Sequence, residues 1–111
     1  MKSYTDIEQS KKLAEILPLE SADMWWVALN WQETEYYVEV KQDGISQPKK
    51  AVPCWSLSAL LEQLENAAGL AKDYGLWFCY DNRKSYCTKH YNNPVDACYE
   101  LILKLHELNL L

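Results

Sequence analysis

Apolar residues recur along the chain at two spacings, and each spacing predicts one type of element. Between residues 6 and 17 they recur about every 3.6 residues behind a Thr5–Glu8 capping box, which predicts a helix over Asp6–Leu17. The same period after Ser56 predicts a second helix that ends near Gly69. A third helix is predicted after Asn93, an N-cap residue that precedes a proline at the first helical position.

Alternation of apolar and polar residues predicts two β-hairpins between these helices. The first pairs Met24–Trp31 with Glu35–Lys41, and the second pairs residues 76–80 with residues 85–90. The stretch Asp43–Pro53 contains glycine and prolines, so we expect it to be irregular and to pair only as an edge.

The predicted order of elements is α-ββ-α-ββ-α, which is typical of an α+β fold. We therefore expect residues 1–111 to form a single α+β domain. Its two hairpins would join into one four-stranded, mainly antiparallel sheet, with the helices packed on one face. A length of 111 residues and a hydrophobic fraction of 49% are sufficient for one such core.

The charge balance narrows the class of partner. The net charge is −5, whereas duplex nucleic acid and anionic lipid both attract clustered Lys and Arg. The sequence contains neither a secretory signal nor an apolar run of the roughly 20 residues that would cross a bilayer. We therefore expect a cytoplasmic protein that binds neither a membrane nor duplex nucleic acid, with its four cysteines reduced.

Two stretches carry a resemblance to other proteins. Val52–Glu62 has the pattern Pro-x-Trp-Ser-Leu-Ser-x-Leu-Leu, and Asn92–Glu100 has the pattern Asn-Pro-x-Asp-Ala. Both resemble segments of small uncharacterised proteins found in prophages and other mobile elements of gut bacteria. The resemblance implies a bacterial mobile-element setting and carries over no activity and no functional residue. Read from the residues alone, both stretches are helix starts.

The aromatic residues favour contact with a protein. Five Trp and eight Tyr against one Phe are a balance suited to half-buried contact surfaces. Trp26 and Tyr37 are candidates for the outer face of the sheet. On the last helix, Tyr99, Leu103 and Leu110 lie outside its apolar and polar stripes. Our first hypothesis is therefore a small non-catalytic interaction protein that uses these two surfaces to bind a protein partner or a second copy of itself.

A second hypothesis is a binding module for single-stranded nucleic acid or for a small ligand that stacks on aromatic rings. Arg83, Lys84 and Lys89 occur together without an acidic neighbour, and aromatic side chains on a sheet face can stack on bases. Trp26 and Tyr37 would supply those rings.

The third hypothesis is a zinc-stabilised or enzymatic domain that uses Cys and His side chains. Cys79, Cys87, His90 and Cys98 are close in sequence and include a spacing that zinc ligands use, but no Cys-x-x-Cys knuckle is present. Cys79 and Cys87 would face each other if Tyr80 pairs with Tyr86 in the hairpin. Because the sequence also contains no nucleophile elbow and no Gly-rich phosphate loop, we expect no catalytic residue, no metal and no cofactor.

Overall fold

The computed structural model describes residues 1–42, 47–48, 50–64 and 67–111 and has an α+β fold. The elements of this described part are α1 (Ile7–Leu13), the 3-10 helix η1 (Leu19–Ser21), β1 (Met24–Ala28), β2 (Tyr36–Val40), β3 (Ala51–Cys54), α2 (Leu57–Glu62), β4 (Ala68–Asp73), β5 (Leu76–Asp81), β6 (Tyr86–Cys87) and α3 (Pro94–Glu107).

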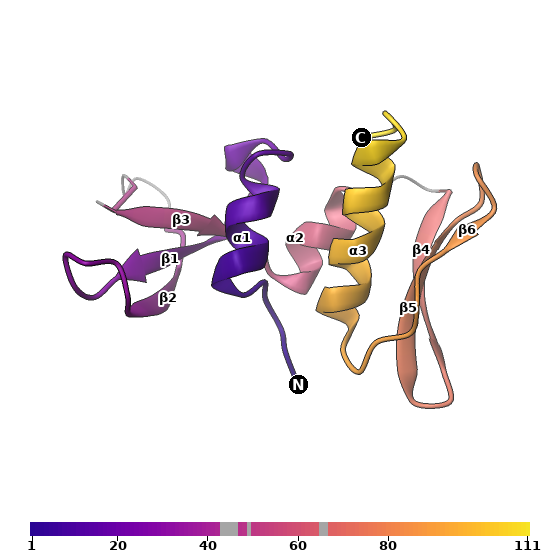
Figure 1. The fold of residues 1–111 in the computed structure, drawn as a ribbon, viewed down its shortest axis with the longest axis horizontal. Helices are drawn as coiled ribbons and strands as arrows, with labels where there is room; N and C mark the ends of the chain where they lie inside the picture. The colour runs from indigo at the N-terminus through magenta and orange to yellow at the C-terminus, as the bar shows by residue number, and fades with distance from the viewer. Residues whose placement is uncertain (43–46, 49, 65–66) are drawn as a thin grey trace.

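The described strands form two antiparallel three-stranded sheets, so the prediction of a single four-stranded sheet was wrong. Sheet 1 has the order β2-β1-β3, and sheet 2 has the order β4-β5-β6. Figure 1 shows the sheets at opposite ends of the molecule, which measures 44 × 28 × 24 Å, with the three α-helices between them. The predicted order lacked β3 and β4. Each of them gives its hairpin a third strand. Neither hairpin therefore needs to pair with the other to form a stable sheet.

The extra strand of sheet 1 comes from the stretch predicted to be irregular. Residues 43–46 and 49 of that stretch lie outside the described residues. Its end, Ala51–Cys54, pairs with β1 as an edge strand, and Pro53 is tolerated there because an edge leaves one side of the strand unpaired.

The helix starts follow the sequence, with one shift. Ser56 and Asn93 cap α2 and α3 as predicted, each accepting from the backbone N–H three residues later. The capping box of α1 is one residue further on than predicted, because Asp6 and Gln9 form it. The Thr5 hydroxyl is instead buried, 2.7 Å from the Ser10 hydroxyl. Two predicted helix ends were also wrong, since α1 ends at Leu13, and Gly69 lies in β4.

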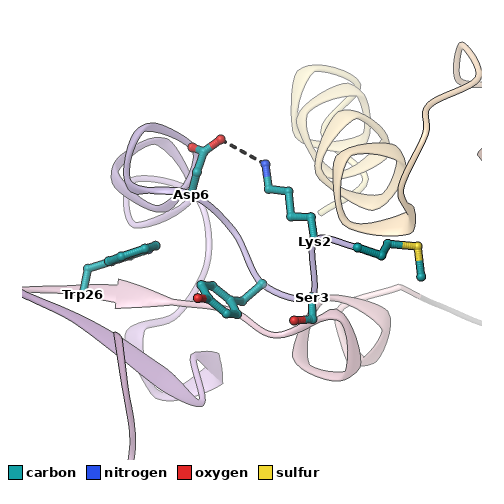
Figure 2. Close-up of a pocket in the computed structure, with 6 residues that line it drawn as sticks. Lys2, Ser3, Asp6 and Trp26 are labelled. Atoms are coloured by element: carbon teal, nitrogen blue, oxygen red, sulfur yellow. Dashed lines mark hydrogen bonds and ion pairs between the residues drawn. The ribbon is translucent and has the colours of Figure 1, made fainter. Parts of the chain in front are cut away.

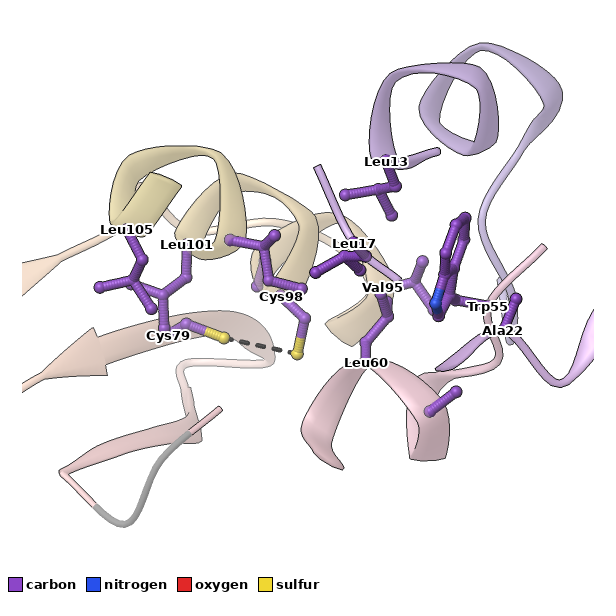
Figure 3. Packing of buried hydrophobic residues seen from close by; sticks show 13 residues of the cluster. Leu13, Leu17, Ala22, Trp55, Leu60, Cys79, Val95, Cys98, Leu101 and Leu105 are labelled. Carbon is purple, nitrogen blue, oxygen red and sulfur yellow. Dashed lines mark hydrogen bonds between the residues drawn. The ribbon is translucent and has the colours of Figure 1, made fainter. Parts of the chain in front are cut away.

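The hydrophobic core lies between the helices and the inner faces of the two sheets. Figure 3 shows Trp55 and Leu60 packing against the first turns of α3, while Leu101 and Leu105 of α3 pack towards β5. Trp55 is fully buried, and its indole N–H donates to the Ser21 hydroxyl at 3.0 Å, so its one polar atom keeps a partner.

Candidate functional site

Three exposed large apolar side chains lie at the end of the β1–β2 hairpin that carries its connecting loop. Trp31 is 77% exposed, Leu29 is 61% exposed and Tyr37 is 41% exposed. We call these three residues the hairpin patch. The register pairs Val27 with Tyr37, and the Leu29 amide donates to the Glu35 carbonyl at 2.7 Å, so Leu29 and Tyr37 are diagonal neighbours on one face of the sheet.

Hydrogen bonds hold the loop that carries Trp31. The side chain of Asn30 accepts from the Thr34 amide at 3.0 Å and donates to the Thr34 hydroxyl at 2.7 Å. The Lys50 ammonium group donates to the Trp31 carbonyl at 3.0 Å. The backbone around Trp31 is therefore held in place while its indole ring remains in solvent.

The surroundings of the hairpin patch are acidic. Glu33, Glu35 and Glu39 are exposed, and Lys41 is the only basic residue between positions 28 and 42. Lys41 itself lies over the Trp25 ring at 4.3 Å and donates to the Leu19 carbonyl, and burial lowers the pKa of its ammonium group. Lys41 therefore covers Trp25, and the Lys50 ammonium group on the Trp31 carbonyl is the cation next to the patch, against three exposed glutamates.

Trp26 does not share a face with Tyr37, which corrects the prediction from sequence. The register places Trp26 on one face with Val38 and Tyr36, and Lys11 of α1 lies over the Tyr36 ring, so this face is the one towards α1. The Trp26 indole N–H donates to the Thr5 carbonyl at 3.0 Å, and its ring meets the Tyr4 ring edge-on at 5.7 Å. The alternation divided the residues of Met24–Trp31 correctly between two faces. The prediction that the face with Trp26 points outwards was wrong.

Trp26 instead lines a pocket beside the N-terminal segment. Figure 2 shows this pocket, of about 270 Å³, between Trp26 and the first residues of the chain. The Lys2 ammonium group lies 3.0 Å from Asp6 and 2.8 Å from Asp96, so it joins α1 to the start of α3. Burial opposes the ionised form of Asp96, but hydrogen bonds from Lys2, Asn93 and Gln9 leave its pKa below the usual range. The side-chain charges of Lys2 and Asp6 at this pocket are therefore already paired with each other, and Lys2 is also paired with Asp96.

The predicted flank of α3 lies largely against the molecule itself. Tyr99 and Leu110 are half-buried and pack against the core, and Leu103 is also half-buried. Burial raises the pKa of the Tyr99 phenol. These three residues therefore offer less free surface than the hairpin patch does.

The basic residues of the nucleic-acid hypothesis lie in sheet 2, at the opposite end of the molecule from Trp26 and Tyr37. Arg83 binds the buried carboxylate of Asp81, with 2.6 Å between Arg83 Nη2 and Asp81 Oδ2, and this hydrogen bond lowers the pKa of Asp81. Lys84 and Lys89 are exposed. The structure therefore does not bring the three basic residues together with the two predicted rings.

The Cys and His set does not converge. Cys87 is opposite Tyr80, so the register differs by one residue from the one that would bring Cys79 and Cys87 face to face, and Cys87 is exposed. Cys79 faces α3, where its sulfur lies 3.5 Å from that of Cys98 (Figure 3). Within the described ranges, no group of three or more His, Cys, Asp or Glu side chains is arranged to hold a metal ion.

Sequence reasoning missed one feature of sheet 2. Phe78 and Tyr80 alternate with buried Cys79 on the central strand β5, so both rings lie on the face that points away from α3. The His90 ring lies 4.8 Å from the Phe78 ring. The alternation of residues 76–80 divides β5 into two faces. It identifies the outer face only if Cys79 is also assigned to the core.

The sequence matches no protein-family model, and no curated protein or solved structure matches it at a significant level. In the part of the chain that is described, no helix is both long enough and apolar enough to cross a membrane.

Proposed function

We propose that this chain is a small non-catalytic interaction protein that binds a basic protein partner through the hairpin patch. The observation that carries the proposal is the exposure of Trp31, 77%, next to Leu29 on a loop whose backbone is already fixed. Large aromatic side chains that stay in solvent on an ordered surface are typical anchors of protein interfaces.

The charge around the patch specifies the partner. Glu33, Glu35 and Glu39 surround apolar side chains, which is the arrangement of an interface with an apolar centre and a polar rim. A partner that fits would offer an apolar pocket for the Trp31 indole and Lys or Arg side chains around that pocket.

The setting we propose is a bacterial mobile element, and its support is the resemblance of Val52–Glu62 and Asn92–Glu100 described above. Because Ser56 and Asn93 cap helices, both stretches serve the fold and neither belongs to the hairpin patch.

The test is affinity capture from a lysate of gut bacteria with matched variants, followed by measurement of the purified pair. We expect one basic protein that is captured by the wild type and lost with Trp31→Ala. Tyr74→Ala is the control, because Tyr74 is 98% exposed in the β4–β5 turn at the other end of the molecule. We expect the Tyr74→Ala variant to bind as the wild type does.

Truncation of a central aromatic anchor costs about 2 kcal/mol or more, which weakens binding by at least about 30-fold. The purified pair should also bind less tightly as salt increases, because the rim is charged. Failure to find any protein whose capture depends on Trp31 would contradict the proposal, and so would equal loss in the two variants.

A further inference from the structure

The outer face of sheet 2 carries a row of aromatic rings. Cys79 lies between Phe78 and Tyr80 on β5 and is fully buried against Cys98, so its two neighbours point the other way. The ring centroids of Phe78 and Tyr80 are 6.5 Å apart, and those of Phe78 and His90 are 4.8 Å apart. We call Phe78, Tyr80 and His90 the aromatic row. None of the three packs against the hydrophobic core cluster.

Strand β4 provides no large side chain to cover this row. Ala71 is opposite Phe78, and Gly69 is opposite Tyr80. The Tyr80 ring lies across Gly69 so closely that a Cβ on that glycine would be 2.6 Å from Tyr80 Cζ. Directly opposite the two β5 rings, β4 therefore offers only a methyl group and a glycine, while Asp73 lies further along the same face with its carboxylate 3.8 Å from His90 Nε2.

The charge of this part of the chain is opposite in sign to the rest. Residues 68–92 contain four basic and two acidic residues, a formal charge of +2, whereas the other residues contain seven basic and fourteen acidic residues, a formal charge of −7. Asp81, one of the two acids, is neutralised by Arg83. Lys84 in the β5–β6 turn and Lys89 after β6 are exposed and lie between Tyr80 and His90 in the sequence.

We propose that this face binds single-stranded nucleic acid. The bases would stack on Phe78 and Tyr80, and Lys84 and Lys89 would contact the phosphates. Open sheet faces with alternate aromatic residues on a central strand and basic residues at their edge suit unpaired bases, because every base has a π face and every nucleotide a phosphate. Duplex fits less well, since its bases are already stacked on each other. This proposal is independent of the hairpin patch, which is at the other end of the molecule.

Fluorescence anisotropy tests the proposal with a labelled 15-nucleotide oligothymidylate and the matching oligouridylate, at about 50 mM and 200 mM salt. We expect Phe78→Leu to weaken binding by about 10-fold, because leucine retains apolar bulk but has no ring to stack on. We expect the double variant Lys84→Glu/Lys89→Glu to bind more weakly and to lower the slope of log K against log salt by about 1.4, which corresponds to two phosphates on a single strand. The two oligonucleotides distinguish DNA from RNA as the preferred strand.

The control is Lys11→Glu/Lys12→Glu, the same charge change at two exposed positions of α1, which should weaken binding by less than about threefold. Circular dichroism confirms that each variant is folded. The proposal is overturned if neither oligonucleotide binds at about 50 mM salt, if Phe78→Leu binds as the wild type does, or if both double variants lose affinity equally. It is also overturned if duplex of the same length or inorganic polyphosphate binds as tightly as the single strands, because charge alone would then explain the affinity.

Discussion

Replacement of Gly69 by alanine tests the strand that sequence analysis missed. In the structure β4 pairs with β5 so that Gly69 is directly opposite Tyr80, and the Tyr80 ring covers the glycine. If residue 69 were instead inside a continuation of the second helix, the same change would stabilise the protein, because alanine is the better helix former. The two assignments therefore predict opposite signs.

The magnitude follows from the geometry. The new Cβ would lie 2.6 Å from Tyr80 Cζ and 3.1 Å from Tyr80 Cε1, so the ring must rotate away from its place on the sheet. Forcing an extra methyl group into a packed site costs about 1–3 kcal/mol. The lower entropy of alanine in the unfolded chain returns about 0.4–1 kcal/mol. We expect a net loss of about 1 kcal/mol in the free energy of unfolding.

Urea unfolding followed by circular dichroism measures this change, and a double-mutant cycle with Tyr80→Ala isolates its cause. In the Tyr80→Ala background nothing opposes the new methyl group, so Gly69→Ala should stabilise the protein by about 0.5 kcal/mol. The expected coupling between the two positions is therefore about 1.5 kcal/mol. Equal stabilisation by Gly69→Ala in both backgrounds would refute the register of β4 and with it the face that carries the aromatic row.

Three further predictions follow from burial and charge. Trp31→Ala should change the free energy of unfolding by less than about 0.5 kcal/mol in a urea titration, since its side chain is largely in solvent, whereas Trp55→Ala should cost about 3–5 kcal/mol. A maleimide should label Cys87 alone in the native protein and all four cysteines in denaturant, because Cys54, Cys79 and Cys98 are buried and burial raises the pKa of the Cys54 thiol. The hydrogen bond from Arg83 lowers the pKa of Asp81 in the folded state. This carboxylate therefore stabilises the fold at pH values above its unfolded pKa of about 3.9. The stabilisation is lost as the pH falls through the lower pKa of the folded state. Asp81→Asn should therefore reduce stability at pH 7 and flatten its decline between about pH 4 and pH 2, measured as thermal midpoints against pH.

The parts of the fold that sequence predicted are those with a local cause. Asn93 and Pro94 fix the start of α3, because the amide side chain accepts a helix N–H and proline needs no hydrogen-bond donor there. The hairpin β1–β2 was predicted from its alternation, and its residues do divide between two faces as expected.

The parts that sequence did not predict depend on contacts between distant residues. Strand β4 contains Ala68, Gly69 and Ala71, which have low strand propensity, and the glycine is favourable there because the ring of Tyr80 covers it. Which face of sheet 1 points outwards also depends on contacts between residues that are distant in the sequence. Trp26 points inwards because the Thr5 carbonyl, twenty-one residues earlier in the chain, accepts its N–H. Alternation divides a strand into two faces but does not say which face a helix will cover.

The two sheets lie apart, so aromatic and basic residues that the sequence analysis assigned to one binding surface belong to two separate surfaces in the structure. The hairpin patch is aromatic and acidic, the aromatic row is aromatic and basic, and the helices hold them at opposite ends of a molecule 44 Å long. A ligand on one surface therefore does not obstruct the other.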